Sequence, residues 1–478
     1  MTAKETHDSR EIGIIARLAL AFTAWAERWV PDAFIFALVA TLIVVLAATS
    51  VAGATMAQVI DAWGNSFWDL IPFALQMSLI IITGHVLATS PPVRRLIQTI
   101  ASWPNSPRAA VALVAAFAMS TSWLNWGFSL IFSAVLAREI ARRLNGVDYR
   151  ALAAASFLGL GSVWAQGLSG SAALQMATPG ALPPQIRDIV SNGGIVPGGI
   201  IAFGDTIFLW QSLLSVVIEI SVVTFVMWLA TPPANRAKTA ADLGISLKET
   251  TSFNPAANEQ PRPGSWLEHS PILTWLIVGF GSAYVIRYFV AAQDPLNAIT
   301  LNILNLTFLL LGFLLHGTPA RLMHAVQTAT PAVWGVILQF PFYAGIAGII
   351  TATQLNAQLA NLFVSISTQT TFAPVVALYS AVLGVFVPSG GSKWVIEAPY
   401  VMAAAHELKV HLGWVIAAYD LGEALANLIQ PFWMLPILAM FGLRARDVMG
   451  YTFLIFLVLT PLVLLMVWLL GLTLQYPL

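Results

Sequence analysis

Long apolar segments, separated by short polar stretches, dominate the chain. A helix that crosses a membrane needs about 20 mostly apolar residues. Segments of that kind cover residues 33–52, 67–89, 199–230, 271–292, 297–315, 331–351 and 450–473. The first apolar stretch of the chain is different, because Arg17, Glu27 and Arg28 interrupt it. We expect this stretch to form an amphipathic helix at the membrane surface, before a series of full spans.

Four further apolar regions are interrupted near their midpoints. Residues 109–143 and 372–408 are each too long for one helix and too short for two. Residues 151–178 and 412–441 are broken by Gln166-Gly-Leu-Ser-Gly-Ser171 and by Asp420-Leu-Gly-Glu423. Non-helical backbone is tolerated at membrane depth only where protein or water satisfies its polar groups. We therefore predict two re-entrant helical hairpins and two broken helices, one of each in either half of the chain.

The interruptions recur at matching positions in the two halves. Asn125 follows Gln76 by 49 positions, and Pro388 follows Gln339 by 49 positions. Paired interruptions of this kind are typical of transporters built from inverted repeats, with the substrate site between the halves. The predicted fold is an all-α polytopic membrane protein with two inverted-topology repeats. The repeats cover residues 1–230 and 271–478, joined by a cytoplasmic linker over residues 231–270.

Basic residues give an independent test of this topology, because Lys and Arg concentrate in short cytoplasmic loops. With the N-terminus inside, 18 of the 22 basic residues lie on the cytoplasmic side. Only Arg187, Arg287 and Lys409 lie outside, and Lys393 falls within the second hairpin. Under this assignment the first hairpin opens to the cytoplasm and the second to the outside, so the two repeats have opposite orientations.

Composition narrows the class further. The chain is 58% hydrophobic and 9% charged, whereas soluble domains carry about 25% charged residues. It has no cysteine and zero formal net charge, which excludes disulfides and gives no basic surface for nucleic acid. The sequence shows no motif of an enzyme active site. It has no nucleophile paired with a base, and its glycine-rich segments do not follow a predicted strand, as a phosphate-binding loop would. We expect neither a metal nor an organic cofactor, and an intramembrane enzyme remains a remote alternative.

The residues at the four interruptions form the candidate substrate site. Helix ends inside a membrane present free backbone N–H groups and the positive end of the helix dipole, and both attract carboxylates. Tryptophans beside the breaks, among them Trp123 and Trp164, are either an apolar wall for a small acid or an interfacial belt. The candidate substrate-binding residues are Ser122, Asn125, Trp126, Ser129, Gln166, Ser169, Ser389, Gly390, Gly391, Ser392, Lys393 and Trp394.

Ionisable residues at membrane depth are functional candidates because burying them is costly. Lys393 is expected to pair with a substrate carboxylate or with Glu397, four positions further along the same helix. Asp420 and Glu423 lie one turn apart in the second broken helix, near Asn427. They either bind a coupling proton or Na⁺, or satisfy freed backbone N–H groups. The candidate coupling-ion residues are therefore Asp420, Glu423, Asn427 and Glu397.

Several of these runs resemble those of the bacterial short-chain fatty acid transporters, and the resemblance extends over nearly the whole chain. They are Thr121-Ser-Trp-Leu-Asn-Trp-Gly-Phe-Ser129, Gln166-Gly-Leu-Ser-Gly-Ser171, Pro388-Ser-Gly-Gly-Ser-Lys-Trp394 with Glu397-Ala-Pro-Tyr400, and Asp420-Leu-Gly-Glu-Ala-Leu-Ala-Asn427. The resemblance implies uptake of acetoacetate and butyrate-like acids across the bacterial inner membrane. It also implies membership of the ion-transporter superfamily, whose dicarboxylate carriers are homodimers with inverted repeats and re-entrant hairpins.

The hairpin tips depart from those dicarboxylate carriers, which carry Ser-Asn-Thr at both tips to hold Na⁺ and the substrate carboxylate. Here the first tip offers Ser122 and Asn125 with Trp between them, and the second has Ser389-Gly-Gly-Ser-Lys393. An ammonium next to the site repels a second cation, so we expect proton symport by an elevator-type carrier of monocarboxylates. The alternative is a Na⁺-coupled carrier of dicarboxylates or other organic anions.

Overall fold

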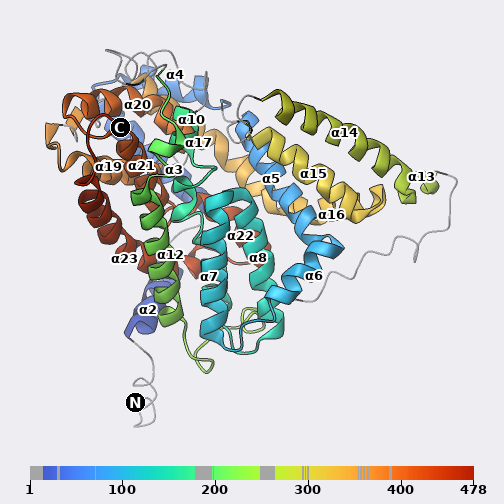
Figure 1. Cartoon of the computed structure of the whole chain (residues 1–478). Coiled ribbons are helices and arrows are strands. Elements are labelled where there is room, and N and C mark those ends of the chain that lie inside the picture. The colour runs from blue at the N-terminus through green and yellow to red at the C-terminus, as the bar shows by residue number, and fades with distance from the viewer. Residues whose placement is uncertain are drawn as a thin grey trace, which may run out of the picture.

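In the part of the chain that the structure describes, all regular secondary structure is helical and there is no β-strand. The structure is a computed structural model. It describes residues 14–29, 33–69, 71–177, 199–247, 264–292, 301–353, 365–386 and 390–478, with residues 196, 295, 298, 355, 358, 361 and 362 between them. Figure 1 shows the helices packed side by side, with α2, the first described helix, at the lower end of the view and the C-terminus at the upper end.

The first half contains long single helices and several short helical pieces. Its elements are α2 (Ile14–Trp29), α3 (Ala33–Ser50), α4 (Met56–Ser66), α5 (Ile71–Thr89), α6 (Pro91–Ile100), α7 (Pro107–Leu124), α8 (Trp126–Arg143), α9 (Tyr149–Phe157), η1 (Val163–Gln166), α10 (Ser171–Ala177), η4 (Phe203–Asp205) and α12 (Trp210–Ala230). One predicted span is shorter than expected, because its helix begins at Trp210 and not at residue 199.

The second half repeats this alternation of long and short pieces. Its elements are α13 (Ser265–His269), α14 (Pro271–Ala291), α15 (Leu301–His316), α16 (Pro319–Ala329), η6 (Thr330–Val333), α17 (Trp334–Ala352), α19 (Phe372–Phe386), α20 (Gly390–Glu407), α21 (Leu412–Ala426), η7 (Phe432–Met434), α22 (Leu435–Phe441) and α23 (Ala445–Gly471).

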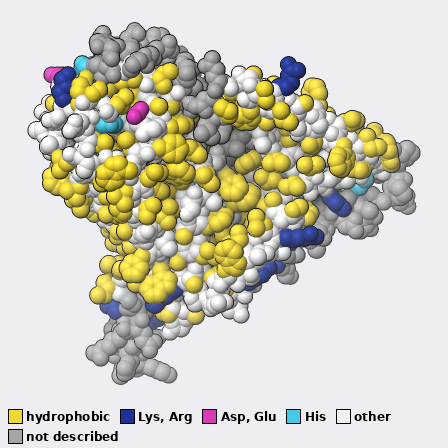
Figure 2. Space-filling view, in the orientation of Figure 1, with side chains coloured by type: hydrophobic (Ala, Val, Ile, Leu, Met, Phe, Trp, Pro, Cys, Tyr) yellow, Lys and Arg dark blue, Asp and Glu magenta, His cyan; other side chains and the backbone are white. Residues whose placement is uncertain are grey.

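Several long helices are apolar and expose large apolar side chains at the surface of the molecule. Four described helices, α7, α12, α14 and α23, have the length and composition of membrane spans. Two further pairs, α5 with α6 and α16 with α17, pass the same test but are bent by 78° and 56°. On α14, Phe280 and Val290 are 82% and 80% exposed, and Figure 2 shows apolar side chains over most of this face, with basic ones along its lower edge. The predicted class, an all-α polytopic membrane protein with broken helices, is confirmed.

The first hairpin, α7 with α8, opens toward the lower end of the view in Figure 1, where α2 lies. Directly after this hairpin, the Tyr149 N–H donates to the Lys238 carbonyl at 2.9 Å, in the segment that follows α12. The Tyr149 hydroxyl donates to the Phe441 carbonyl, at the end of α22, at 3.3 Å. The end of α8, the end of α12 and the end of α22 therefore lie together on one face.

The second hairpin, α19 with α20, opens toward the opposite face. The Gln369 side chain donates to the Lys409 carbonyl at 2.9 Å, which ties the start of α19 to the end of α20. The Leu412 N–H donates to the Pro477 carbonyl at 2.9 Å, close to the C-terminus. The two hairpins thus open toward opposite faces of the molecule.

A separate group of helices, α5, α14, α15 and α16, lies on the right of Figure 1. α5 and α15 are held together by polar contacts. The Asn305 side chain donates to the Gln76 carbonyl at 2.9 Å, and a His316 ring nitrogen lies 2.8 Å from the Val86 carbonyl oxygen. This group packs beside the first hairpin through contacts of α5 and α6 with α8.

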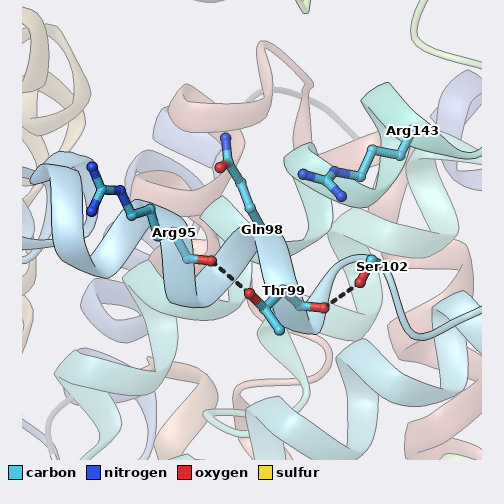
Figure 3. A pocket seen from close by; sticks show the side chains of 5 residues that line it. All are labelled: Arg95, Gln98, Thr99, Ser102 and Arg143. Carbon is cyan, nitrogen blue, oxygen red and sulfur yellow. Dashed lines mark hydrogen bonds between the residues drawn. The ribbon is translucent and has the colours of Figure 1, made fainter.

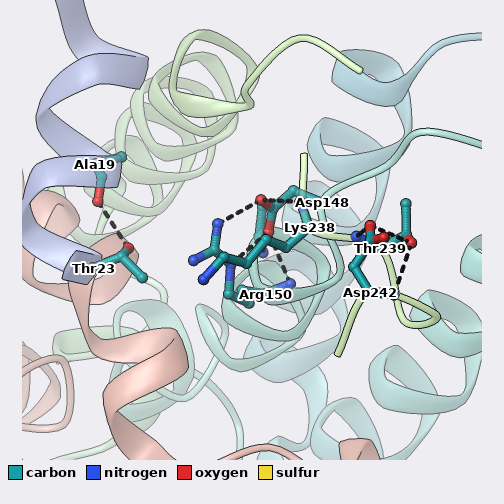
Figure 4. A network of polar contacts seen from close by, with 8 residues as sticks. Ala19, Thr23, Asp148, Arg150, Lys238, Thr239 and Asp242 are labelled. Carbon is teal, nitrogen blue, oxygen red and sulfur yellow. Dashed lines mark hydrogen bonds and ion pairs between the residues drawn. The ribbon is translucent and has the colours of Figure 1, made fainter. Parts of the chain in front are cut away.

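The segment after α12 is fastened to the start of α9, as Figure 4 shows. Asp148 caps α9 by accepting from the Arg150 and Ala151 N–H groups at 3.0 and 3.2 Å. Its second oxygen pairs with the Arg150 guanidinium at 2.8 Å and accepts from the Lys238 N–H at 3.1 Å. The first part of the predicted linker therefore has a defined structure.

Candidate functional site

Two broken crossings meet in the middle of the molecule. One consists of α9, η1 and α10, and the other of α21, η7 and α22. The Asn427 side chain, just after α21, donates to the Leu160 carbonyl, just after α9, at 3.0 Å. Gly161 lies so close to the Leu428 side chain that an added Cβ would stand 2.5 Å from it. The gaps in the two crossings therefore face each other.

The second break lies at a different place from the predicted one. Asp420 and Glu423 were expected to interrupt the helix, but α21 continues through both to Ala426. The interruption comes at residues 427–431 and ends in Pro431, which has no N–H and whose ring clashes with a helical carbonyl four residues earlier. Asp420 and Glu423 remain helical because other elements supply partners for their side chains.

Asp420 connects the two crossings. Its two carboxyl oxygens accept from the Ala172 and Ala173 N–H groups, each at 3.3 Å, at the start of α10. Free N–H groups at the beginning of a helix are favourable partners for a carboxylate. The second of the two predicted roles for Asp420, satisfying backbone N–H groups, is thus the contact that the structure contains.

The tip of the first hairpin is closed by its own polar residues. Asn125 separates α7 from α8, and its side-chain oxygen accepts from the Phe128 N–H at 2.9 Å as the N-cap of α8. One turn later the Ser129 hydroxyl donates to the Ala118 carbonyl on α7 at 2.6 Å. Asn125 therefore caps α8, and Ser129 ties α8 to α7.

The first tip is also joined to the first break. The Trp126 N–H donates to the Ser169 hydroxyl at 3.1 Å, and the Leu168 N–H donates to the Trp123 carbonyl at 2.9 Å. An added Cβ at Gly167 would lie 2.0 Å from the Trp123 carbonyl oxygen, so only glycine permits this approach. Tip and break form a single unit.

The tip of the second hairpin is described from Gly390 onward, and Ser389 lies outside the described residues. The Gly390 carbonyl accepts from the Tyr419 hydroxyl at 2.9 Å, and the Gly391 carbonyl accepts from the Gln175 side chain at 3.0 Å. Ser392 belongs to α20, and its side chain is not among those described. α20 therefore begins against α21 of its own half and α10 of the other.

A charged cluster is buried between the second hairpin and α21. The Lys393 ammonium lies 2.5 Å from Glu423 Oε2, and the two side chains are 3% and 1% exposed. Lys393 also donates to the Ser380 carbonyl at 2.7 Å and to the Ser380 hydroxyl at 3.0 Å. Its third neighbour is the Tyr419 ring, whose centroid is 4.7 Å away. The ammonium is thus enclosed by α19, α20 and α21.

Carboxyl groups outnumber the cations in this cluster. Glu397 is 1% exposed and lies within electrostatic reach of both Lys393 and Glu423. Asp420 is also 1% exposed and is a further neighbour of the same pair. Among the described side chains, three carboxyls therefore share one ammonium. Keeping all three carboxyls ionised at membrane depth is costly, and binding a proton or another cation would lower that cost.

Several buried hydrogen-bond donors near the first tip find no partner among the described residues. They are the Ser122 hydroxyl and the indole N–H groups of Trp123 and Trp164. Buried polar groups in proteins are usually hydrogen-bonded, so unpaired donors need an explanation such as a missing ligand or water. Donors without acceptors suit an anion, whose oxygens accept only.

The tryptophans beside the breaks do not form one group. The Trp126 ring lies 5.4 Å from Trp433 and 6.5 Å from Trp164. Trp394 instead packs on Tyr419 at 4.6 Å, and no ring contact in the described part of the chain links it to the others. An aromatic wall at the first break is therefore separate from the aromatic pair at the second tip.

Sequence reasoning missed one buried carboxyl, Glu219 of α12, which accepts from the Gln166 side chain at 2.7 Å. The sequence alone could have indicated this residue, because Glu219 is the only charged residue in the apolar segment that forms α12. The Gln166 amide N–H is therefore directed toward α12, and a substrate contact of Gln166 stays a prediction.

A cleft of about 350 Å³ lies elsewhere, on α6 and the end of α8 (Figure 3). Its lining is formed by Arg95, Gln98, Thr99, Ser102 and Arg143. Arg143 pairs with Glu139 at 2.8 Å. None of the predicted site residues lines this cleft.

Comparison with known proteins gives one family and two similar proteins, all described by the same transport role. The family described as "Short chain fatty acid transporter" matches residues 14–470. A protein of Escherichia coli strain K12, to which short-chain fatty acid transport is ascribed, is 37% identical over 439 residues, covering 92% of this chain and 96% of the relative. A Haemophilus influenzae protein with the same ascribed role is 34% identical over 441 residues, again covering 92% and 96%.

One solved structure is also similar in outline. The crystal structure of the Alcanivorax borkumensis YdaH transporter aligns with a TM-score of 0.43 and 14% identity, over 92% of this chain and 98% of that one. At this level the likeness carries no weight for function. The two sequence relatives and the family match together establish that the chain belongs to the short-chain fatty acid transporter family.

Proposed function

We propose that this protein is a secondary active transporter that imports short-chain fatty acids, such as acetoacetate and butyrate-like monocarboxylates, by proton symport. The observation that carries the proposal is the buried polar centre where two broken crossings meet two oppositely directed hairpins. Unpaired donors at the first tip suit a carboxylate, and the carboxyl-rich cluster around Lys393 suits a proton.

The substrate carboxylate is proposed to bind at the first tip and the first break. Ser122, Trp123 and Trp164 offer the buried donors, and Trp126 with Trp433 offers an apolar wall for the short tail. Such a pocket favours a small monocarboxylate, because a second carboxylate would meet the apolar wall without a partner.

The coupled proton is proposed to reside in the cluster of Glu397, Asp420 and Glu423. Lys393 is a fixed countercharge for that cluster, since it is already paired with Glu423 at 2.5 Å. A resident ammonium also disfavours Na⁺ at the same place, because like charges repel at low dielectric. Proton coupling is accordingly proposed over sodium coupling.

The remaining features of the proposal concern the membrane. Each half would act as one repeat with a re-entrant hairpin, in the bacterial inner membrane, with the N-terminus in the cytoplasm. Movement of the hairpins and broken helices past the α5, α14, α15 and α16 group would give elevator-type alternating access. Assembly as a homodimer through that group is part of the same proposal.

The test is uptake of labelled butyrate or acetoacetate into proteoliposomes, driven by an imposed pH gradient or by a Na⁺ gradient. Protein-free liposomes are an essential control, since neutral short-chain acids cross bilayers unaided. We expect protein-dependent uptake with the pH gradient alone. Uptake only with Na⁺ would favour the alternative organic-anion carrier, and entry of neither acid would refute the proposal.

Lys393→Ala tests the buried cluster in the same uptake assay. Lys409→Ala is its matched control, because Lys409 lies near the end of α20 and packs over Tyr476, outside the cluster. We expect the first variant to lose proton-driven uptake and the second to retain it.

A further inference from the structure

Glu219 lies near the middle of a long apolar helix. α12 runs from Trp210 to Ala230, and Glu219 is its only charged residue. The side chain is 1% exposed. In a spanning helix of 21 residues this position is close to the membrane centre, where a charged side chain is most costly.

Glu219 differs in its partners from the other buried carboxyls that the structure describes. Its Oε1 accepts from the Gln166 side-chain N–H at 2.7 Å, and no cation in the described part of the chain pairs with it. The others have stronger partners: Glu139 has Arg142 and Arg143, Asp148 has Arg150, Glu423 has Lys393, Glu397 has Lys393 as a neighbour, and Asp420 has two backbone N–H groups.

The elements packed around α12 bring no charge to this position. α12 contacts α7, α23, α2 and η1. η1 has no charged residue, and Arg108 of α7 stacks over Trp228, in the last turn of α12. Neither these nor any other described charged side chain acts on Glu219. The remaining charged positions on these helices are Arg446 and Asp447 in the first turn of α23, and Arg17, Glu27 and Arg28 on α2.

A neutral carboxylic acid fits the surroundings of Glu219 better than a carboxylate. A protonated carboxyl has one O–H donor that needs an acceptor. The Gln166 side-chain oxygen is buried and has no hydrogen-bond partner among the described residues. An acid and an amide can satisfy each other by exchanging two hydrogen bonds, O–H to the amide oxygen and N–H to the acid carbonyl. A carboxylate could use only one of the two.

We propose that Glu219 and Gln166 form a proton-binding site at the first broken crossing, in addition to the cluster of the second half. The proton enters from water on one face, resides on the Glu219 carboxyl while it pairs with Gln166, and leaves to the other face. Gln166 is followed by Gly167 and Leu168, whose backbone holds the first hairpin tip through Trp123. Protonation of Glu219 therefore acts on the tip through the short segment Gln166-Gly-Leu168.

Infrared difference spectroscopy of the purified full-length protein across a series of pH values tests proton binding directly, without transport. A protonated carboxyl has a C=O band that a carboxylate lacks. We expect Glu219→Gln to abolish one such band and Gln166→Leu to shift it, while Glu139→Gln leaves it unchanged because Glu139 is paired with two arginines. A wild-type band unaffected by Glu219→Gln, or no such band at any pH, would overturn the proposal.

A role in coupling rests on the transport function proposed above and is tested by the ratio of protons to substrate in proteoliposomes. We expect Glu219→Gln to lower that ratio by one proton while retaining exchange of substrate at equal concentrations, because glutamine still pairs with Gln166. An unchanged ratio would overturn the coupling role. Wild-type protein that moves neither acid would refute the proposed function instead, and the infrared result would still decide the proton site. Should Glu219→Gln fail to fold, Gln166→Leu is the second variant for both measurements.

Discussion

Lys393 of α20 and Glu423 of α21 form a buried ion pair, with the ammonium 2.5 Å from one carboxyl oxygen. Glu397, one turn further along the same helix, lies closer to Lys393 in the sequence and was the predicted partner within the protein. The hairpin packs so that the ammonium instead reaches across to α21 and to Ser380 of α19. The pair therefore fixes the second hairpin against the second broken crossing.

Breaking this pair should destabilise the protein more than removing it altogether. We expect Lys393→Met and Glu423→Gln each to lower the free energy of unfolding by about 3–5 kcal/mol, because each leaves a buried group uncompensated. The double variant should lose much less than the sum of the two. Denaturant unfolding in detergent micelles measures all three, and additive losses would contradict a direct coupling.

Replacing Asp420 should loosen the start of α10. Asp420→Asn keeps the size of the side chain but removes the charge that both N–H groups, of Ala172 and Ala173, now contact at 3.3 Å. We expect faster hydrogen exchange at these two amides and a loss of about 1–3 kcal/mol, in the range for hydrogen bonds to charged groups.

The control for that exchange experiment is Asp242→Asn in the segment after α12. Asp242 is exposed, and hydrogen bonds from Thr239 hold its pKa below the usual range, so it stays ionised at neutral pH. Unaltered exchange at residues 172 and 173 in Asp420→Asn would show that the carboxylate does not hold α10.

Glycines set the distance between hairpin arms and broken crossings. An added Cβ at Gly159 would lie 2.3 Å from the Ala118 carbonyl oxygen, and one at Gly422 would lie 2.0 Å from the Ala377 carbonyl oxygen. We expect alanine at either position to cost about 1–3 kcal/mol, since neighbouring backbone must move.

Gly279→Ala is the matched control for both glycines. It lies in α14, where an added Cβ meets nothing within 4 Å. Alanine there should be neutral, or stabilising by up to about 1 kcal/mol through its higher helix propensity. Thermal unfolding compares the variants, and equal midpoints for all three would refute the close approach.

Asp148 should be the main anchor of the segment after α12. Asp148→Ala removes the N-cap of α9, about 1–2 kcal/mol, and leaves the Arg150 side chain, 4% exposed, without its carboxylate. It also removes the acceptor of the Lys238 N–H. We expect a loss above 2 kcal/mol and faster limited proteolysis within residues 234–247, whereas Asp242→Ala should show neither. Equal proteolysis of the two variants would argue against the anchor.

Interruptions in the apolar pattern located the hairpin tip at Asn125 and the two broken crossings. The interruptions located these features because polar, Gly-rich sequence at membrane depth is tolerated only where the protein itself satisfies the backbone hydrogen bonds. Acidic residues were a poorer guide to the second break. Asp420 and Glu423 stay helical, and Pro431 marks the break, because proline removes a donor while an acidic side chain needs only a partner. The first residues of the 199–230 span are apolar but not α-helical, since hydropathy reports composition and not hydrogen bonding.

The sequence by itself determined the membrane class, the positions of the main interruptions and the set of polar residues available at depth. These follow from one-dimensional properties, namely segment length, mean apolarity and the cost of unpaired backbone groups. Only the tertiary structure decided which partners those residues take: Lys393 with Glu423, Asp420 with α10, and Gln166 with Glu219. The last pairing joins residues 53 positions apart. Electrostatic and hydrogen-bond partnerships depend on distances of a few ångströms, and helix packing, not sequence spacing, sets those distances.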